Sequence, residues 1–168
     1  GLDIWKEEKY REIQGTYPII FLSFAGIKGN NYEFARQQIC IQIADIYEKN
    51  RYLLERDILS DNEKEFYKNV NIYMSDATLS ESINKMSSFM SRYYGKNVII
   101  LLDEYDTPMQ EAYVNGYWEE LVSFTRSFFN ATFKSNLYLE RAVITGITRV
   151  SNCLLYTSDA ADEARSVD

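Results

Sequence analysis

Three short runs of apolar residues stand out along the chain, and each has the length of a β-strand. They are residues 17–24, 98–102 and 141–149, the last of which passes into polar residues at its end. Nearly continuous apolar runs of this length are typical of strands that are buried on both faces of a sheet. We therefore expect three buried strands.

Between these runs, apolar residues recur three and four positions apart, which predicts helices. Helices are expected over residues 1–13, from Tyr32 onward, and as one long helix over residues 113–134. Strands that alternate with helices along a chain indicate an α/β fold with a mostly parallel central sheet.

Two sequence signatures mark where further helices should begin. Ser60 with Glu63, and Thr78 with Glu81, each match a capping box. In this motif a Ser or Thr side chain and a Glu three residues later satisfy backbone N–H groups at a helix start. Gly95 marks the expected end of the second of these helices.

The ends of the predicted strands are where a ligand is expected, because open parallel sheets bind ligands beyond the carboxyl ends of their strands. This rule selects residues 23–28, 103–107 and 145–149. The most informative feature is a run of five apolar residues followed by Asp103 and Glu104. A carboxylate just past a buried strand can hold Mg²⁺, so Asp103 is the candidate metal ligand. Side chains alternate along a strand, so Glu104 should point elsewhere and hold an attacking water. A solvated junction between strand and loop is the alternative interpretation.

Two further candidates stand at the end of the last run. Thr145 can sense a γ-phosphate or orient the water, and Arg149 can stabilise charge on a transferring phosphoryl group. Taken alone, Thr145 is more often a satisfied strand-end hydroxyl and Arg149 a surface ion pair. Asp106, which precedes Thr107 and Pro108, is interpreted as a helix N-cap or turn residue rather than a third catalytic acid.

Composition narrows the chemistry that the chain can perform. It contains no histidine, which excludes Ser-His-Asp and Cys-His catalysis and His-ligated metals within it. The two cysteines lack metal-ligand spacing, and Cys40 is interpreted as a small core residue. A net charge of −7 argues against a large surface for nucleic-acid phosphates. No signal peptide or membrane-spanning run is visible, so a reducing cytoplasm is the expected location and no membrane partner is expected.

The segments Asp-Glu-Tyr-Asp-Thr-Pro (103–108) and Thr-Gly-Ile-Thr-Arg (145–149) occur together, and as a pair they are specific. The chain resembles one family in both, the AAA-ATPase-like domain proteins of bacteria. Matching residues also occur near the start, over residues 17–24 and around residues 51–54 and 93–96. The resemblance covers essentially all of residues 1–151.

This resemblance implies a partial P-loop NTPase-like three-layer fold that uses ATP and Mg²⁺. Asp103 and Glu104 would take the Walker B place, Thr145 the sensor place and Arg149 a phosphate-facing place. Members of the family often carry a C-terminal PD-(D/E)XK nuclease-like domain. The resemblance therefore implies a link to DNA through a domain downstream of this chain, and it leaves an oligomer open.

Two departures from the family pattern are expected to matter. The Walker A loop, which ends in Gly-Lys-Thr and cradles the phosphates, is absent and should lie upstream of Gly1. We therefore expect these residues alone to bind ATP weakly and to hydrolyse it negligibly. After Ser151 the pattern stops, and residues 153–163 resemble a translated sequencing adaptor. Residues 152–168 are thus expected to be a non-native tail behind a partial ATPase-like domain over residues 1–151.

ATP hydrolysis by the full-length protein is the favoured function, with this piece inactive or nearly so. The alternative is a non-hydrolysing nucleotide-sensing switch or a protein-interaction module of a larger DNA-linked protein. In that case the tyrosine-rich helices would provide interface surface. A nuclease is disfavoured for this chain, and any nuclease would sit downstream of it.

Overall fold

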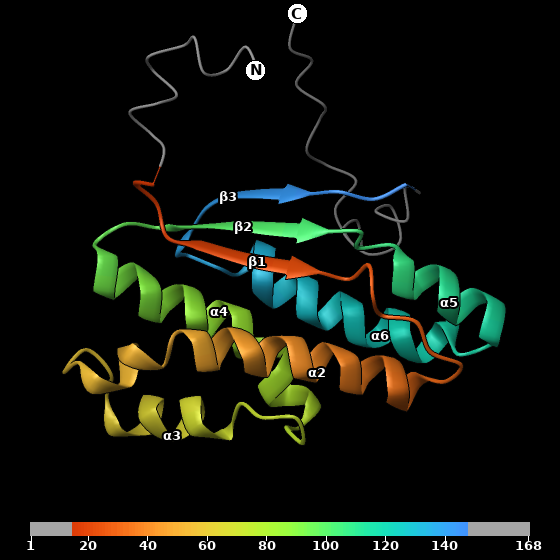
Figure 1. The fold of residues 1–168 in the computed structure, drawn as a ribbon, viewed down its shortest axis with the longest axis horizontal. Coiled ribbons are helices and arrows are strands. Elements are labelled where there is room, and N and C mark those ends of the chain that lie inside the picture. Colours follow the sequence, from red (N-terminus) through yellow and green to blue (C-terminus); the bar gives the residue numbers. More distant parts are fainter. Residues whose placement is uncertain (1–14, 148–168) are drawn as a thin grey trace, which may run out of the picture.

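A computed structural model describes residues 15–147, and at its centre is a three-stranded parallel sheet (Figure 1). The strands β1 (Ile19–Ser23), β2 (Val98–Asp103) and β3 (Leu139–Ile144) are ordered β1-β2-β3, so β2 is hydrogen-bonded along both of its edges. The expected α/β class with a parallel sheet is confirmed. β3 begins and ends earlier than the predicted range of residues 141–149.

Helices cover one face of the sheet, as Figure 1 shows. In chain order the helical elements are α2 (Tyr32–Lys49), the 3₁₀ turn η2 (Arg51–Glu55), α3 (Asp61–Asn69), α4 (Asp76–Tyr94), α5 (Thr107–Asn115), α6 (Trp118–Phe129) and the π-helical turn η3 (Asn130–Lys134). The predicted spacing is confirmed in α2, which buries Ile39 and Ile43 together with Cys40. Burial of each such aliphatic side chain contributes roughly 1.5 to 3 kcal/mol to stability.

The two faces of the sheet differ in exposure, because side chains alternate across each strand. Against the helices, the following side chains are each no more than 1 % exposed: Ile20, Leu22, Ile100 and Leu102. On the other face, Ile19, Phe21 and Val143 are 53 %, 57 % and 49 % exposed. The prediction that the strands are buried on both faces is wrong within residues 15–147, where no helix covers this second face.

Helix boundaries follow side-chain caps and glycines. Ser60 accepts from the N–H of Glu63, and the Glu63 carboxylate accepts from the N–H of Ser60 (2.9 Å), so the first capping box is confirmed. The second is wrong, because Ser75 caps α4 by accepting from the N–H of Thr78 (3.2 Å). A serine can cap a helix without a partner Glu, and this one precedes Thr78 by one turn. α4 ends at Gly95, as predicted, with a left-handed φ of 67°.

The single helix predicted over residues 113–134 is wrong, since two helices and a π-helical turn occupy this region. Pro108 lies in the first turn of α5, which begins at Thr107. Backbone N–H groups in the first turn have no acceptor within the helix, so proline, which lacks an N–H, is tolerated there. Gly116 ends α5 with a φ of 81°, and α6 begins at Trp118. Apolar residues keep their spacing across this break, which hid it from pattern analysis.

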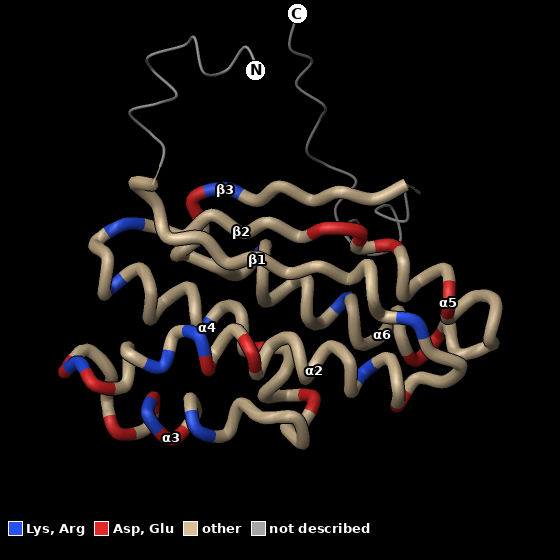
Figure 2. Tube along the Cα trace, viewed as in Figure 1, with Lys and Arg blue, Asp and Glu red and all other residues tan. Residues whose placement is uncertain are grey.

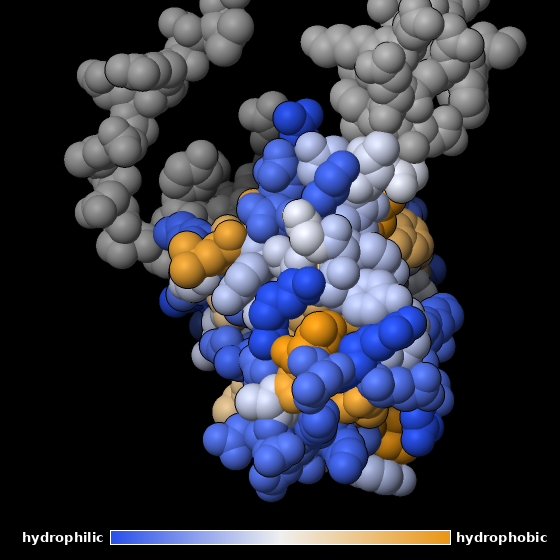
Figure 3. Space-filling view, turned by 90° about the vertical axis from the view of Figure 1, so that its left-hand side faces the viewer, coloured by the Kyte–Doolittle hydropathy of each residue, from blue (hydrophilic) through white to orange (hydrophobic). Residues whose placement is uncertain are grey.

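Within residues 15–147, no helix combines the length and the apolar character that crossing a bilayer requires. The end of the molecule at which the strands begin is mostly hydrophilic, with apolar areas at its centre and toward both sides (Figure 3). Three predictions fall outside the described residues: the helix over residues 1–13, the position of Arg149 and the tail over residues 152–168.

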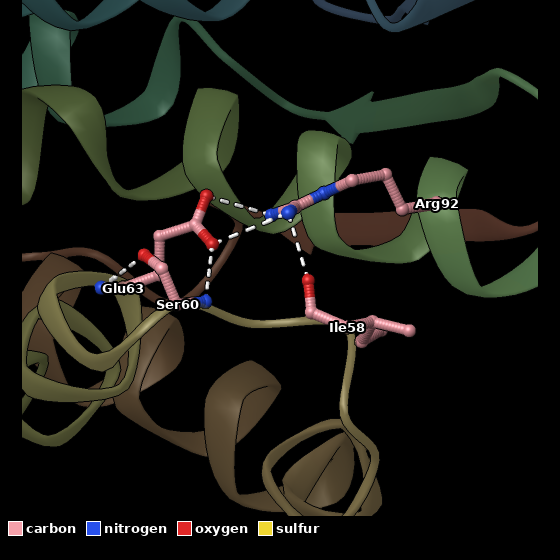
Figure 4. A network of polar contacts seen from close by, with 4 residues as sticks. All are labelled: Ile58, Ser60, Glu63 and Arg92. Carbon is pink, nitrogen blue, oxygen red and sulfur yellow. Dashed lines mark hydrogen bonds and ion pairs between the residues drawn. The ribbon is translucent and has the colours of Figure 1, made fainter.

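Arg92 on α4 holds this helix to the start of α3 (Figure 4). Its guanidinium donates to both carboxylate oxygens of Glu63 (2.7 and 3.2 Å) and to the backbone oxygen of Ile58 (2.8 Å). Burial acts to raise the pKa of the Glu63 carboxyl, but the bonds from Ser60 and Arg92 outweigh it and lower that pKa. Glu63 therefore serves both the cap of α3 and the attachment of α3 to α4.

We expect Glu63→Gln to lower the free energy of unfolding by about 1 kcal/mol near neutral pH. The amide can still accept from Ser60 but cannot pair with the Arg92 guanidinium. A lowered folded-state pKa gives stabilisation that is present above the unfolded-state pKa and is lost as the pH falls through the folded-state pKa. Urea unfolding should therefore show the deficit of the variant shrinking as the pH is lowered. Glu65→Gln, at an exposed position of α3, is the matched control; a deficit that stays constant with pH would contradict the ion-pair account.

Candidate functional site

The carboxyl ends of the three strands place three polar side chains in one row. Ser23 is paired in register with Asp103, and Thr145 directly follows β3, with its N–H donating to the backbone oxygen of Leu102 (2.9 Å). Along each strand this row lies two positions beyond the apolar residues of the helix-free face, so it continues that face. The residues two positions earlier are Phe21, Leu101 and Val143. Figure 2 shows the acidic end of β2 at this edge of the sheet.

Thr145 contacts both of the acids that the sequence singled out. Its hydroxyl donates to Oδ1 of Asp103 and accepts from the N–H of Glu104 (3.2 Å). Its backbone oxygen accepts from the N–H of Tyr105 (3.1 Å). Thr145 is thus a satisfied strand-end hydroxyl that also fixes the loop after β2. The structure brings together Asp103, Glu104 and Thr145 as the sequence analysis expected.

Glu104 opens the loop after β2 in an unusual backbone conformation. Its φ is 50°, and it is the only non-glycine residue with a positive φ in the described part of the chain. Such a conformation costs roughly 1 to 3 kcal/mol for a residue with a side chain. The strand ends at Asp103, so this left-handed turn, and not strand alternation as predicted, directs the Glu104 side chain. The carboxylate is exposed and accepts from Oγ1 of Thr107 (3.2 Å).

Asp106 occupies the position before α5 but does not cap it with its side chain. The prediction that Asp106 is the N-cap or turn residue before α5 is confirmed by its position, although its side chain makes its hydrogen bonds elsewhere. Its Oδ2 accepts from Nε2 of Gln110 (3.0 Å) and from the N–H of Ile147 (3.1 Å). The Ile147 contact joins the loop after β2 to the chain after β3. Nothing in the local sequence pattern could have indicated it, because the two partners are far apart along the chain.

The donors at this edge fit a cation that keeps part of its water shell. Within residues 15–147, no group of three or more His, Cys, Asp or Glu residues could by itself enclose a metal. Mg²⁺ commonly takes only one or two protein carboxylates and completes its shell with water and substrate phosphates. Asp103, with the hydroxyls of Ser23 and Thr145 in the same row, matches this partial donor set. No individual role was predicted from the sequence for Ser23 or Thr107.

A groove of about 460 Å³ lies in the helical layer and not at this edge. Its lining comes from α2, α4 and α6 and includes the carboxylates of Asp76, Glu81 and Glu120. Burial and, after it, the charge of Asp76 raise the pKa of Tyr32 in this groove to about 12. No basic residue lines the groove, so it is poorly suited to the phosphates of a nucleotide. The strand-end row remains the better candidate.

Comparison with known proteins gave one match. A family model described as AAA-ATPase_like, predicted AAA-ATPase, matches residues 1–155. No curated protein and no solved structure matches the chain significantly. The family match confirms the resemblance drawn from residues 103–108 and 145–149.

We expect Glu104→Gly to raise the free energy of unfolding by about 0.5 to 1 kcal/mol, since glycine adopts a positive φ without a Cβ penalty. The same replacement at Glu111, inside α5, should lower it by about 1 kcal/mol. Urea unfolding of both variants measures the contrast. Equal destabilisation by the two replacements would show that Glu104 is not strained.

Thr145→Val keeps the shape of the side chain but removes its hydroxyl. We expect exchange of the Glu104 amide hydrogen to accelerate about tenfold, which corresponds to loss of a hydrogen bond of about 1.4 kcal/mol. Thr145→Ser should restore the slow exchange. NMR-detected exchange measures the effect, with the amide of Ile100 in the central strand as internal reference. Unchanged exchange at Glu104 in the valine variant would contradict the assigned contact.

Proposed function

The chain belongs to the predicted AAA-ATPase-like family, and from this membership we propose that the edge formed by Asp103, Glu104 and Thr145 is the metal-and-water half of an ATP hydrolysis site. The observation that carries the proposal is the contact of one hydroxyl, that of Thr145, with both acidic residues at the end of the central strand. The carboxylate of the last residue of β2 and the backbone of the first loop residue are thereby held by one side chain.

Asp103 is the proposed metal ligand. It ends the strand that is paired on both sides, and the Thr145 hydroxyl orients its carboxylate. Ser23 is paired in register with Asp103, which places the two side chains on the same side of the sheet, where water and phosphate oxygens would complete a magnesium shell. Mg²⁺ bound together with ATP would neutralise charge on the β- and γ-phosphate oxygens.

Glu104 is the proposed residue that holds and deprotonates the attacking water. Its carboxylate is exposed to solvent, and the bond from Thr107 directs one of its two oxygens. A positioned base of this kind contributes roughly 10² to 10⁴ to a rate. The left-handed backbone at Glu104 supports the assignment, because strained conformations cluster where a side chain must be aimed. Arg149 is proposed to stabilise charge on the transferring phosphoryl group.

The groups that bind the β- and γ-phosphates are proposed to come from residues other than Asp103, Glu104 and Thr145. The sequence contains no Gly-Lys-Ser or Gly-Lys-Thr, whose backbone amides and lysine hold β- and γ-phosphates in P-loop proteins. The described residues would then contribute positioning and electrostatics, on which phosphoryl transfer depends most. DNA as a partner through a downstream domain, an oligomer and a cytoplasmic location stay predictions.

A second candidate function is a nucleotide-sensing or interaction module that does not hydrolyse ATP. The observation that favours it is the helix-free face of the sheet, on which Ile19, Phe21 and Val143 are about half exposed. Neighbouring apolar side chains left open in this way mark surfaces that bind other protein. In this case the Asp103–Thr145 contact would report on a bound nucleotide without supporting turnover.

In the protein encoded by the complete reading frame, Glu104→Gln should lower kcat for ATP by about 100-fold or more and leave ATP binding within about threefold. The amide keeps the size of the side chain but cannot accept the proton of the water. Release of labelled phosphate measures turnover, and equilibrium dialysis with labelled ATP measures binding.

Glu119→Gln, at an exposed position of α6, is the matched control and should leave kcat unchanged. The 168 residues alone should show no turnover above background. Full activity of the Glu104 variant would overturn the role of this residue. Wild-type protein that binds ATP but never hydrolyses it would favour the second candidate function.

A further inference from the structure

Asp106 is the only charged residue in the described part of the chain that is almost fully buried, with 1 % of its surface exposed. Burying a carboxylate is unfavourable unless hydrogen-bond donors surround it. Gln110 supplies one donor from its own helix, and the N–H of Ile147 supplies another from the far side of the loop pair. The hydrogen bond from Ile147 therefore connects the loop after β2 to the chain that follows β3.

Gly146 shows how closely these two segments pack. A Cβ placed there would lie 2.7 Å from Oδ1 of Asp106 and 2.7 Å from Cε1 of Tyr105. Non-bonded carbon atoms do not lie this close to other heavy atoms, so a side chain at residue 146 would displace the side chains of Asp106 and Tyr105. Its backbone conformation is ordinary, which means that space and not φ demands glycine here. The chain after β3 therefore lies directly on Tyr105 and Asp106.

Thr145 stands between the central strand and this contact. On one side its backbone is bonded to Leu102 and Tyr105, and two residues further on Ile147 is bonded to Asp106. Its hydroxyl is the group that touches Asp103 and Glu104. A movement of Ile147 away from Asp106 would therefore act on Thr145 through only two peptide units, and it would loosen the contact of the Thr145 hydroxyl with both acids.

We propose that Asp106 is a positioning residue that fixes Thr145 against Asp103 and Glu104 by holding the N–H of Ile147. It acts through Thr145 and touches neither nucleotide nor metal. An effect of Asp106 on kcat rests on the proposed ATP hydrolysis. Its effect on the structure of the loops after β2 and β3 does not depend on that proposal. Displacement of reacting groups by about 1 Å can lower a rate by roughly 100-fold, so a contact that holds them has a large effect on kcat.

The first test uses the chain itself and does not depend on hydrolysis. Asp106→Ala should speed exchange of the Ile147 amide hydrogen and, about tenfold or more, that of the Glu104 amide. Exchange at Ile100 in the central strand should stay slow, which shows that the variant is folded. Gly146→Ala should give the same pattern from the other side of the contact, and it replaces Asp106→Ala if that variant does not fold. Gln110→Ala removes only the donor from α5 and should leave the Glu104 amide unchanged.

The second test uses the protein from the complete reading frame. Asp106→Ala and Gly146→Ala should lower kcat about 10- to 100-fold, with the KM for ATP within about threefold. Asp106→Asn, whose carbonyl oxygen can still accept from Ile147, should recover a large part of kcat. Gln110→Ala is again the control.

Unchanged exchange at Glu104 in both Asp106→Ala and Gly146→Ala would overturn the proposal, because the contact would then be local only. Unchanged kcat in an active enzyme would overturn it as well. Absence of turnover in the wild type would instead refute the proposed hydrolysis, while the exchange measurements would still decide whether Asp106 positions Thr145.

Discussion

β2 runs between β1 and β3 in the same direction as both. This parallel pairing determines which residues meet at the edge of the sheet. Parallel strands end at a common edge, so Ser23, Asp103 and Thr145 meet there although they come from distant parts of the chain. Asp103 ends the only strand held by hydrogen bonds on both sides within the described sheet. Its position is therefore fixed by the strand with the most hydrogen bonds in the sheet, which suits the role of metal ligand proposed for it.

The two faces of the sheet contribute in different ways: one forms the hydrophobic core, and the other leads to the proposed site. The helices bury one face with Ile20, Leu22, Ile100 and their neighbours, and this burial supplies the main stabilising free energy. On the helix-free face, the apolar positions lead into the polar row at the strand ends. The fold can hold Glu104 in a left-handed conformation there because the surrounding hydrogen bonds to Thr145 and Thr107 restrain the loop. In the proposed site, acids that are preorganised in this way would need little rearrangement on nucleotide binding.

Much of this arrangement could be predicted from the sequence, because its determinants are local. The run before Asp103 predicts a buried strand, Ser60 with Glu63 predicts a capped helix, and Gly95 predicts a helix end. Each depends only on neighbouring residues.

The parts that could not be predicted depend on contacts distant in sequence. The apolar composition of β1 does not tell whether helices cover one face or two. The spacing of apolar residues continues through Gly116, so it hides the break between α5 and α6. The side chain of Asp106 bonds to Ile147 in place of the nearby helix end, and only the folded chain brings these residues together. The positive φ of Glu104 likewise follows from how two loops meet.

The most direct test of the central claim is paramagnetic NMR of the protein from the complete reading frame, with Mn²⁺ replacing Mg²⁺ in the presence of ATP. The account predicts that amide resonances of Ser23, Asp103 and Thr145 broaden first and most strongly as Mn²⁺ is added. Broadening centred instead on the acidic groove of α4 and α6, at Asp76, Glu81 and Glu120, would contradict it.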